Sequence, residues 1–367
     1  MAEQTKKRKA DHIRIALTQN VQARRTTTGF EDLFFVHRAL PEVSRNKINL
    51  STTILDHKFS APLIVGAITG GTGEATKING TIAEAVEELG LGMGVGSQRA
   101  AIQDKKLAKT FDIVREKAPH AFLIANIGGI QLVNGYGLRE VKKAVEMIDA
   151  DAVAVHMNPL QEAVQPEGET NFKGVLEEIG KIASELGKPV IAKETGAGVA
   201  AEDAEKLESA GVKGIDVSGA GGTSCAAVEY YRAKGQTYGS QRRLGDVFWD
   251  WGMPTVASVV EVSQTVNIPV IASGGIRNGV DVAKSIALGA SLASFSQPAL
   301  QAAVKGVEET KTMLSLLVDE LKNVMFLVGA ESVNGLRRAP TVVTGKTAEW
   351  LKMRGFDIEG YARRGRS

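Results

Sequence analysis

The sequence has almost no cysteine, no long apolar runs and no excess of either charge. One cysteine, Cys225, stands in 367 residues, which excludes an intrachain disulfide framework and a cysteine-rich metal site. No apolar stretch approaches the roughly 18 residues of a transmembrane helix, so we expect no membrane contact. The 44 Lys and Arg residues nearly balance the 42 Asp and Glu residues, so a nucleic-acid partner is not implied. The basic segment 6–9 has no apolar stretch after it, unlike a secretory signal, and we expect a cytoplasmic protein.

Glycine is abundant, and the chain from Ala61 onward has a regular rhythm. The 40 glycines exceed an average share of about 7% and indicate many tight turns. Short apolar segments rich in β-branched residues alternate with helical patterns, each pattern typically ended by a glycine such as Gly90 or Gly187. The apolar segments begin near Leu63, Leu91, Phe122, Ala152, Val190, Gly214, Val270 and Ser291. Eight strands, each followed by a helix, predict an α/β fold of the (β/α)8 TIM-barrel type rather than an open doubly wound sheet.

Two segments stand outside this rhythm. Residues 1–60 form an N-terminal extension, which we expect to pack on the barrel mouth and to contain a helix over 10–24. The barrel itself would span 61–367. The interval between the sixth and seventh strands is longer than the other intervals between strands. Residues 223–254 are therefore predicted to be a lid-like insertion after strand six. The apolar helix 307–328 should be the last barrel helix.

The densest group of polar residues follows the fourth strand. His156, Asn158, Gln161 and Glu162 stand within seven positions, just past the buried strand that begins at Ala152. Carboxyl ends of barrel strands are where this fold places its chemistry. The residue before a proline is disfavoured in the helical region, so we expect the segment to stay an open loop.

Other strand ends carry chemistry of the same kind. Glycines after the seventh strand let backbone N–H groups approach an anion, and with Arg277 they predict a phosphate site. Lys193 leaves the fifth strand toward the mouth, either as a snorkelling lysine or as a fixed cation. Polar or small residues at the other ends include Thr69, Ser97, Gln98, Arg99, Asn126, Ser218, Thr223, Ser296 and Gln297.

Nearly the whole chain resembles one family, the type 2 isopentenyl diphosphate isomerases, which are FMN-dependent barrels. The opening stretch from His156 to Phe172 and the pair Arg8-Lys9 are specific to that family, whereas the turn 274–277 is shared by many FMN barrels. The resemblance also includes His12-Ile13, the segments 30–32, 37–42, 61–71 and 94–99, Lys193-Glu194, 221–223, Glu229, and 251–255.

The resemblance implies a site for FMN. The ring would rest on Ala67, Ile68 and Thr69, and its phosphate would lie at 275–277 and 296–297. A fixed cation such as Lys193 would stabilise negative charge on a reduced flavin. The full set implied for the cofactor is Ala67, Ile68, Thr69, Ser97, Asn126, Lys193, Ser218, Thr223, Gly275, Ile276, Arg277, Ser296 and Gln297.

The resemblance also implies the substrate, isopentenyl diphosphate, which would become dimethylallyl diphosphate. Cations would surround the diphosphate, with Mg2+ held by Glu162, because Mg2+ typically takes one or two protein carboxylates. Glu229 would add a water-mediated contact, and Gln161 would orient the hydrocarbon end. The residues implied for the substrate are Arg8, Lys9, His12, Ser97, Gln98, Arg99, His156, Asn158 and Gln161, and those implied for catalysis are Gln161, Lys193 and Glu229.

The reaction moves a double bond without net oxidation, so reduced flavin would serve as the acid and base. NADPH would supply the reduction without being consumed in each turnover. Arg8 and Lys9 lie in a segment with few apolar anchors, which we expect to be disordered until a polyanion orders it. By resemblance, the protein would be a homotetramer or homo-octamer.

Two other interpretations compete with this one. Cys225, just after the sixth strand, would suit a barrel similar to inosine-monophosphate dehydrogenase, with a thiolate nucleophile attacking a purine. A buried lone cysteine is more often a small hydrophobe, and that interpretation explains neither Arg8-Lys9 nor the His156 stretch. A non-catalytic barrel that binds a phosphate ligand as a scaffold would not need the carboxylate of Glu162.

Overall fold

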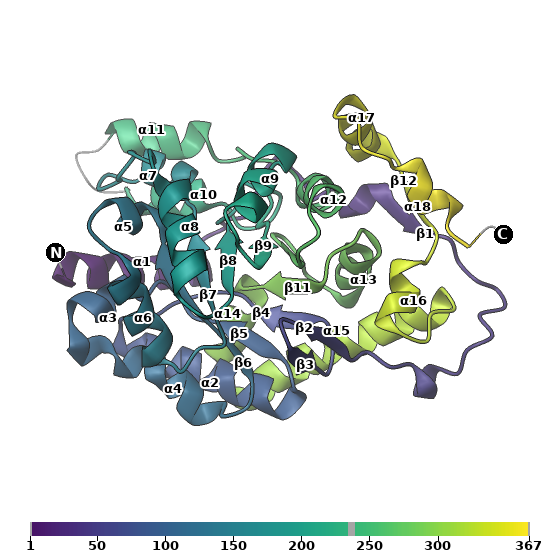
Figure 1. Ribbon diagram of the computed structural model, residues 1–367, viewed down its shortest axis with the longest axis horizontal. Helices are drawn as coiled ribbons and strands as arrows, with labels where there is room; N and C mark the ends of the chain where they lie inside the picture. Colours follow the sequence, from purple (N-terminus) through teal and green to yellow (C-terminus); the bar gives the residue numbers. More distant parts are fainter. Residues whose placement is uncertain (1, 234–238, 366–367) are drawn as a thin grey trace.

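Eight parallel strands close into a barrel in the computed structural model, which describes residues 2–233 and 239–365 (Figure 1). They follow one another around the barrel in chain order, and the ring closes where Ala293 pairs with Leu63. Their bounds are β4 (Leu63–Val65), β5 (Gly92–Gly94), β6 (Phe122–Gly128), β7 (Ala152–His156), β8 (Val190–Lys193), β9 (Gly214–Asp216), β10 (Val270–Ser273) and β11 (Leu292–Phe295). The predicted barrel is confirmed, with its strands in the predicted order.

Helices surround the barrel, and their ends follow from local sequence. The Thr72 side chain accepts a hydrogen bond from the Ala75 N–H at the start of α2, and Gly90 ends that helix with φ 61°. The apolar helix α15 packs between α13 and α2 and is therefore the last barrel helix, as predicted. The surrounding helices are α2 (Gly73–Leu89), α3 (Arg99–Gln103), η3 (Lys105–Leu107), α4 (Lys109–Lys117), α5 (Gly129–Val133), α6 (Leu138–Met147), α7 (Pro159–Val164), α8 (Val175–Glu185), α9 (Ala201–Ser209), α12 (Thr255–Thr265), α13 (Gly279–Ala287), α14 (Gln297–Ala303) and α15 (Val307–Leu327).

The amino end of the barrel is filled by a hairpin. Strands β2 (Thr52–Ile54) and β3 (His57–Phe59) pair antiparallel, and Phe59 packs on Phe122 with ring centroids 5.4 Å apart. Ile54 and Leu55 pack against the same cluster. Because side chains fill this end, the carboxyl end of the barrel is left for a cavity.

The N-terminal extension begins with a helix rather than a disordered arm. Helix α1 covers Ala2–Thr18, so both ends of the predicted helix over 10–24 are wrong. Lys and Arg are good helix formers, which allows the basic segment to extend the helix backward. The end follows from Asn20, whose side chain accepts a hydrogen bond from the N–H of Gln22 and so favours a turn.

Residues 30–47 of the extension pack with the C-terminal segment, on the side of the barrel away from the N-terminus (Figure 1). Strand β1 (Leu33–Phe35) pairs antiparallel with β12 (Thr341–Val343). The remaining elements there are η1 (Phe30–Asp32), η2 (Arg45–Lys47), α16 (Val333–Arg337), α17 (Gly345–Met353) and α18 (Glu359–Arg363). No helix in the described part of the chain is both long and apolar enough to cross a bilayer.

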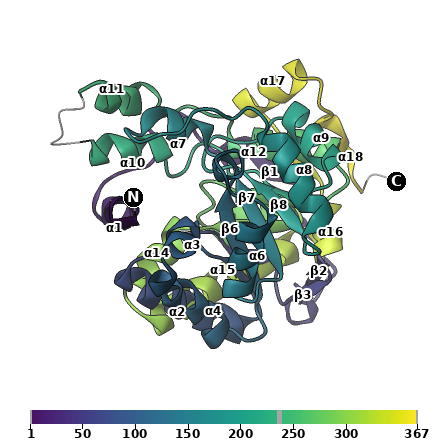
Figure 2. The same cartoon turned by 60° about the vertical axis from the view of Figure 1, so that its left-hand side comes forward.

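The segment predicted as an insertion contains two helices, α10 (Cys225–Arg232) and α11 (Gly239–Val247). Residues 234–238, which lie within the predicted range 223–254, are outside the described residues. Helix α10 packs against α1 and against α7. Figure 2 shows α1 lying between α10 on one side and α3 and α14 on the other, at the open end of the barrel.

Candidate active site

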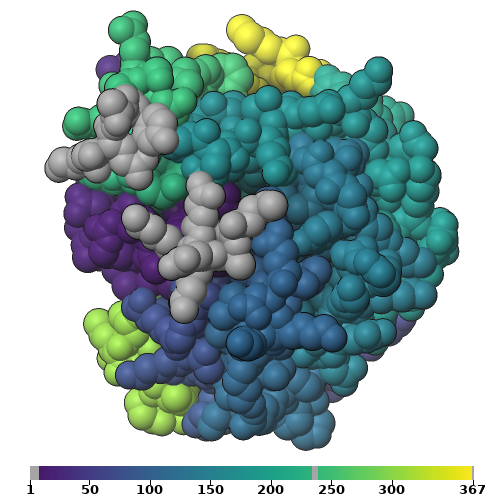
Figure 3. Space-filling model, turned by 90° about the vertical axis from the view of Figure 1, so that its left-hand side faces the viewer, coloured from purple at the N-terminus to yellow at the C-terminus, as the bar shows by residue number. Residues whose placement is uncertain are grey.

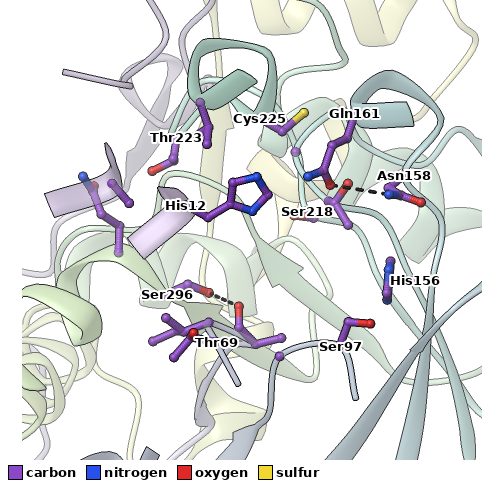
Figure 4. Close-up of a pocket in the computed structure, with 18 of the residues that line it drawn as sticks. His12, Thr69, Ser97, His156, Asn158, Gln161, Ser218, Thr223, Cys225 and Ser296 are labelled. Atoms are coloured by element: carbon purple, nitrogen blue, oxygen red, sulfur yellow. Dashed lines mark hydrogen bonds between the residues drawn. The ribbon is translucent and has the colours of Figure 1, made fainter. Parts of the chain in front are cut away.

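A cavity of about 380 Å³ opens at the carboxyl ends of the barrel strands. Helix α1 forms part of its wall, and in Figure 3 that helix runs between the green insertion and the blue and lime barrel segments. Figure 4 shows His12 pointing from α1 toward Gln161, with Thr69 and Ser97 below. The residues implied by the resemblance that line this cavity are Arg8, Lys9, His12, Ala67, Ile68, Thr69, Ser97, Arg99, Asn126, His156, Asn158, Gln161, Glu162, Lys193, Ser218, Thr223, Gly275, Arg277, Ser296 and Gln297.

The turn after β10 forms a backbone cradle on one side of the cavity. Gly274 has φ 102°, and a Cβ there would lie 2.1 Å from the carbonyl oxygen of Gly219, so only glycine fits. Gly275 has φ 71° and also lines the cavity. The guanidinium of Arg277 donates to the side-chain oxygens of Gln22 (2.8 Å) and Gln297 (3.3 Å), both uncharged. An exposed backbone turn beside a cation bonded only to neutral groups suits a phosphate.

Three cationic side chains gather on another wall. The ammonium of Lys9 donates to the Ser97 carbonyl, and burial, together with the neighbouring Arg8, lowers the pKa of Lys9 to about 7. Arg8 lies 3.9 Å from a carboxylate oxygen of Glu167, and Arg99 lies 3.4 Å from one of Glu169. The Nε of Arg99 is buried and has no hydrogen-bond partner among the described residues. This wall therefore has positive charge and donor capacity available for an anion.

The stretch after β7 is a helix, not the expected open loop. Pro159 occupies the first helical position of α7, where its missing N–H costs nothing, and Asn158 is the residue before it, outside the helix. The proline therefore starts a helix instead of preventing one. On α7, the Glu162 carboxylate accepts hydrogen bonds from Asn158 Nδ2 (2.9 Å), from the Glu169 N–H (2.8 Å) and from the Gln165 amide.

Unpartnered oxygens flank this carboxylate. Oδ1 of Asn158 and Oε1 of Gln165 are buried and have no hydrogen-bond partner within the described residues. Buried polar atoms without partners are rare, and these two oxygens are free to accept an ion or a water molecule. Carboxylate and amide oxygens are ligands that Mg2+ accepts. No cluster of three or more His, Cys, Asp and Glu side chains able to hold a metal occurs in the described ranges, so a metal here would depend on these oxygens and on the substrate.

His156 is held by Asn126 at the bottom of this wall. Its Nδ1 lies 2.7 Å from Asn126 Oδ1, while the Asn126 amide nitrogen donates to the Val95 carbonyl. Since Oδ1 only accepts, Nδ1 of the ring carries the proton. Burial, with the charges of Lys193 and Lys9, lowers the pKa of His156 to about 4, so the ring is neutral at pH 7. The neutral ring then presents an unprotonated Nε2, so His156 would have to take up a proton before Nε2 could donate to a diphosphate.

Three of the implied residues lie outside the cavity lining. Gln98 is buried with both ends of its amide engaged, by the Ala144 carbonyl and the Asn126 N–H at 2.8 Å each, so its expected contact with substrate is wrong. The Gln98 side chain, although it follows a strand end, turns inward and forms hydrogen bonds with backbone groups that would otherwise be buried without partners. The side chain of Ile276 is buried in the core, so any contact of this residue with the cofactor phosphate would be made by its backbone.

Glu229 is the third residue outside the lining, and its catalytic role stays a prediction. Its carboxylate is 1% exposed and accepts hydrogen bonds from His12 (2.9 Å), Arg232 (2.6 Å) and Gln161 (3.4 Å). It lies behind His12 and Gln161 and holds both of them. A water-mediated metal contact would have to displace these partners.

Three residues were missed from the sequence. Asp216 ends β9 and pairs with Lys193, with Nζ to Oδ2 at 2.9 Å. A charged residue inside an otherwise apolar strand was the signal that could have revealed it. Gln165 stands three residues after Glu162, just past the end of α7, and its amide donates to the Glu162 carboxylate. Gln22 lies in the extension, far from any strand end, and no sequence signal pointed to its contact with Arg277.

The geometry agrees with comparisons to known proteins. Residues 1–122 and 132–343 match the model of the FMN-dependent dehydrogenase family. An isopentenyl-diphosphate delta-isomerase of Methanosarcina barkeri is 50% identical over 362 residues, covering 99% of this chain and 98% of the relative. An isopentenyl-diphosphate delta-isomerase of Pyrococcus furiosus is 50% identical over 365 residues, covering 97% and 91%. The chain belongs to the type 2 isopentenyl-diphosphate delta-isomerases, within the FMN-dependent dehydrogenase family.

This membership confirms the resemblance found in the sequence. Solved structures of more distant proteins show the same fold. Flavocytochrome b2 superposes with a TM-score of 0.66 at 18% identity, covering 97% of this chain and 87% of that one. A mandelate oxidase gives 0.63 at 19% identity, covering 90% and 95%.

Cys225 does line the cavity, but not as a thiolate. Burial, with the carboxylates of Glu194 and Glu229, raises the pKa of its thiol well above the usual range. A thiol that stays protonated is a poor nucleophile. The alternative of a barrel similar to inosine-monophosphate dehydrogenase therefore loses the thiolate nucleophile that it requires.

Proposed function

We propose that this enzyme converts isopentenyl diphosphate to dimethylallyl diphosphate with FMN, Mg2+ and a reductant such as NADPH. The observation that carries the proposal is that a glycine cradle, three cations and a buried carboxylate flanked by unpartnered oxygens line the same cavity. Each feature suits one part of the reaction: a flavin, a diphosphate and a divalent cation.

FMN would lie on the floor formed by the ends of β4, β5 and β6. Its phosphate would meet the backbone at Gly275 and the guanidinium of Arg277, with Ser296 and Gln297 beside it. Arg277 would exchange its neutral partners Gln22 and Gln297 for an anion, which makes stronger, charge-assisted hydrogen bonds. Lys193, Ser218 and Thr223 would contact the ring and its side chain from the opposite strands.

The diphosphate would lie against Arg8, Lys9 and Arg99. Mg2+ would bind Glu162, with the oxygens of Asn158 and Gln165 nearby, and phosphate and water would complete its shell. Binding of a polyanion would return Lys9 to its charged form, because nearby negative charge raises a lysine pKa. Release of Arg8 from Glu167 and of Arg99 from Glu169 would free both guanidinium groups.

Reduced FMN, when bound, supplies the acid and base that add a proton to one carbon and remove one from another. The chain's residues would position the alkene, exclude water and neutralise the diphosphate. His12 and Gln161, both held by Glu229, would contact the hydrocarbon end of the substrate.

A protein carboxyl with a suitable pKa does exist, but its position is unsuitable. Burial raises the pKa of Glu194 to about 7. Its carboxylate, however, accepts the N–H groups of Thr195 and Gly196 at 2.6 Å each, and Glu194 is not part of the cavity lining. Its contacts serve to hold the turn after β8.

The extension and the insertion would close the cavity together. Helix α1 and helix α10 pack on each other over the mouth, joined by His12 and Glu229. We propose that this pair acts as a lid over the substrate. Arg8 and Lys9 line their own chain's cavity, so the site does not need a second subunit to supply them, and a homotetramer or homo-octamer remains the proposed assembly.

The proposal is tested by anaerobic incubation of the protein with FMN, Mg2+, reductant and isopentenyl diphosphate. Dimethylallyl diphosphate should form, with omission of any one component abolishing or sharply slowing it. A visible spectrum of the protein after gel filtration with FMN should show retained flavin. Retained flavin without product would favour a scaffold, and no retained flavin would overturn the proposal.

A further inference from the structure

Lys193 and Asp216 form a buried ion pair under the cavity floor. They are the last residues of the neighbouring strands β8 and β9 and stand opposite each other in the sheet register. Lys193 Nζ lies 2.9 Å from Asp216 Oδ2, and the two side chains are 13% and 6% exposed. Lys193 lines the cavity, whereas Asp216 lies beneath it.

The carboxylate of Asp216 is fixed from the other side by β10. The Ser273 hydroxyl donates to Asp216 Oδ1, and the Ser218 N–H donates to Ser273 Oγ at 3.0 Å. Three consecutive strand ends thus hold one chain of polar groups, from Lys193 through Asp216 to Ser273. A buried ion pair is weak evidence for stability, because apolar residues of similar volume often do as well. The pair needs another explanation.

We propose that Asp216 is a positioning residue: it holds the Lys193 ammonium toward the flavin and offsets part of its charge, and so sets the reduction potential of bound FMN. The inference rests on the FMN placement proposed above. A lone lysine beside the ring would favour the anionic reduced flavin through its full charge. Paired with a carboxylate on its far side, the same lysine acts more as a dipole, and its effect on the ring is smaller.

The test is the midpoint potential of FMN bound to wild-type protein and to Asp216→Asn. The variant keeps a hydrogen-bond acceptor for Lys193 but removes the negative charge. We expect about a tenfold higher ratio of reduced to oxidised flavin at a fixed ambient potential, which is about +30 mV for a two-electron couple. Asp151→Asn is the matched control: it makes the same change in charge just before the start of β7, at the opposite end of the barrel, and should leave the potential unchanged.

An unchanged or lower potential in Asp216→Asn overturns the inference. Should that variant fail to fold, Ser273→Ala replaces it. Ser273→Ala removes the hydroxyl that donates to Asp216, so the negative charge of Asp216 acts more strongly on Lys193 and on the flavin. The midpoint potential of bound FMN should therefore fall, and an unchanged or higher potential overturns the inference. Wild-type protein that retains no FMN would overturn both the proposed function and this inference. If the wild type binds FMN and Asp216→Asn has the same midpoint potential, only this inference is overturned.

Discussion

Nε2 of His12 lies 2.9 Å from Oε1 of Glu229, and this contact joins the first helix of the chain to the helix that follows the sixth barrel strand. The carboxylate also accepts from Arg232, which in turn reaches Glu167 at 2.6 Å. Because Glu167 lies 3.9 Å from Arg8, the network returns to α1. The walls of the cavity mouth are therefore joined by buried or half-buried charges rather than by apolar packing alone.

The pH dependence of stability should report on Glu229. Burial raises its pKa, but hydrogen bonds from His12 and Arg232 outweigh burial and bring the pKa to about 2, from an ordinary value of 4.5. A carboxyl with a depressed folded pKa adds stability above its unfolded pKa and loses it as pH falls toward the folded value. Between pH 4.5 and about 2, the free energy of unfolding should fall more steeply for wild type than for Glu229→Gln.

Urea unfolding at a series of pH values measures this difference. Glu205→Gln, on the exposed face of α9, is the control and should track the wild type. Glu229→Gln should also be about 1 to 3 kcal/mol less stable at pH 7, since the buried Arg232 loses one charged partner. Parallel pH profiles for all three proteins would contradict the assignment.

The barrel was predictable because its signal is repeated. Each buried parallel strand is a short β-branched run, and glycines such as Gly90 end the helices, so errors at one element are corrected by the next. The start of α1 and the helix at Pro159 were not predicted because the local sequence at each place is compatible with both a helix and a non-helical segment. Proline restricts the residue before it but also favours the first helical turn, and the sequence does not say which effect prevails.

The sequence predicts the cavity position of side chains that point outward from the ends of the barrel strands. It predicts much less well which side chains near those ends turn back into the protein core. Thr69 and Ser97 follow from register, since they stand just past the strands. Gln98, one residue later, turned inward because two backbone groups needed partners. Asp216 was missed because its partner, Lys193, lies on the next strand, and pairing across strands is set by register rather than by proximity in sequence.

Glu162→Gln should weaken Mg2+ binding and leave FMN binding unchanged. The substitution keeps size and removes the charge, so the Mg2+ concentration for half-maximal activity should rise by about tenfold or more, while FMN stays bound. Steady-state kinetics over a range of Mg2+, with flavin absorbance measured on the same samples, tests this. Glu169→Gln is the control, because that side chain contacts Arg99 and Asn134 rather than the unpartnered oxygens. Wild-type activity at limiting Mg2+ would show that Glu162 does not hold the metal.

Lys193→Ala should lower the midpoint potential of bound FMN. It removes the cation that faces the cavity and leaves the Asp216 charge unpaired beneath the floor, and both changes disfavour the anionic reduced ring. A spectroscopic redox titration against a reference dye measures the potential. An unchanged potential with FMN fully bound would remove Lys193 from its assigned role.

Substrate affinity should weaken as pH rises above 7 through the titration of Lys9. Its pKa in the folded protein is about 7, lowered by burial and by Arg8, so the free enzyme loses this positive charge above that pH. A diphosphate that binds best to the charged form must then take up a proton as it binds, and KM should rise with pH. Lys9→Arg keeps its charge across the range and should flatten the profile. An equally steep rise in that variant would place the titrating group elsewhere.

Deleting residues 1–9 tests whether α1 is part of the active site or only a tail. The deletion removes Arg8 and Lys9 and leaves Ala10–Thr18, which retains His12 and the buried Ile13 and Ile15. The barrel should therefore remain folded and loaded with FMN, while turnover of isopentenyl diphosphate falls strongly, because two of the three cations on the diphosphate wall are lost. Deletion of residues 2–7 shortens the same helix but keeps both cations, and it should retain most of the activity. Steady-state kinetics of the two truncations at fixed salt decides the matter: equal activities near the wild-type value would show that the cations of α1 do not bind substrate.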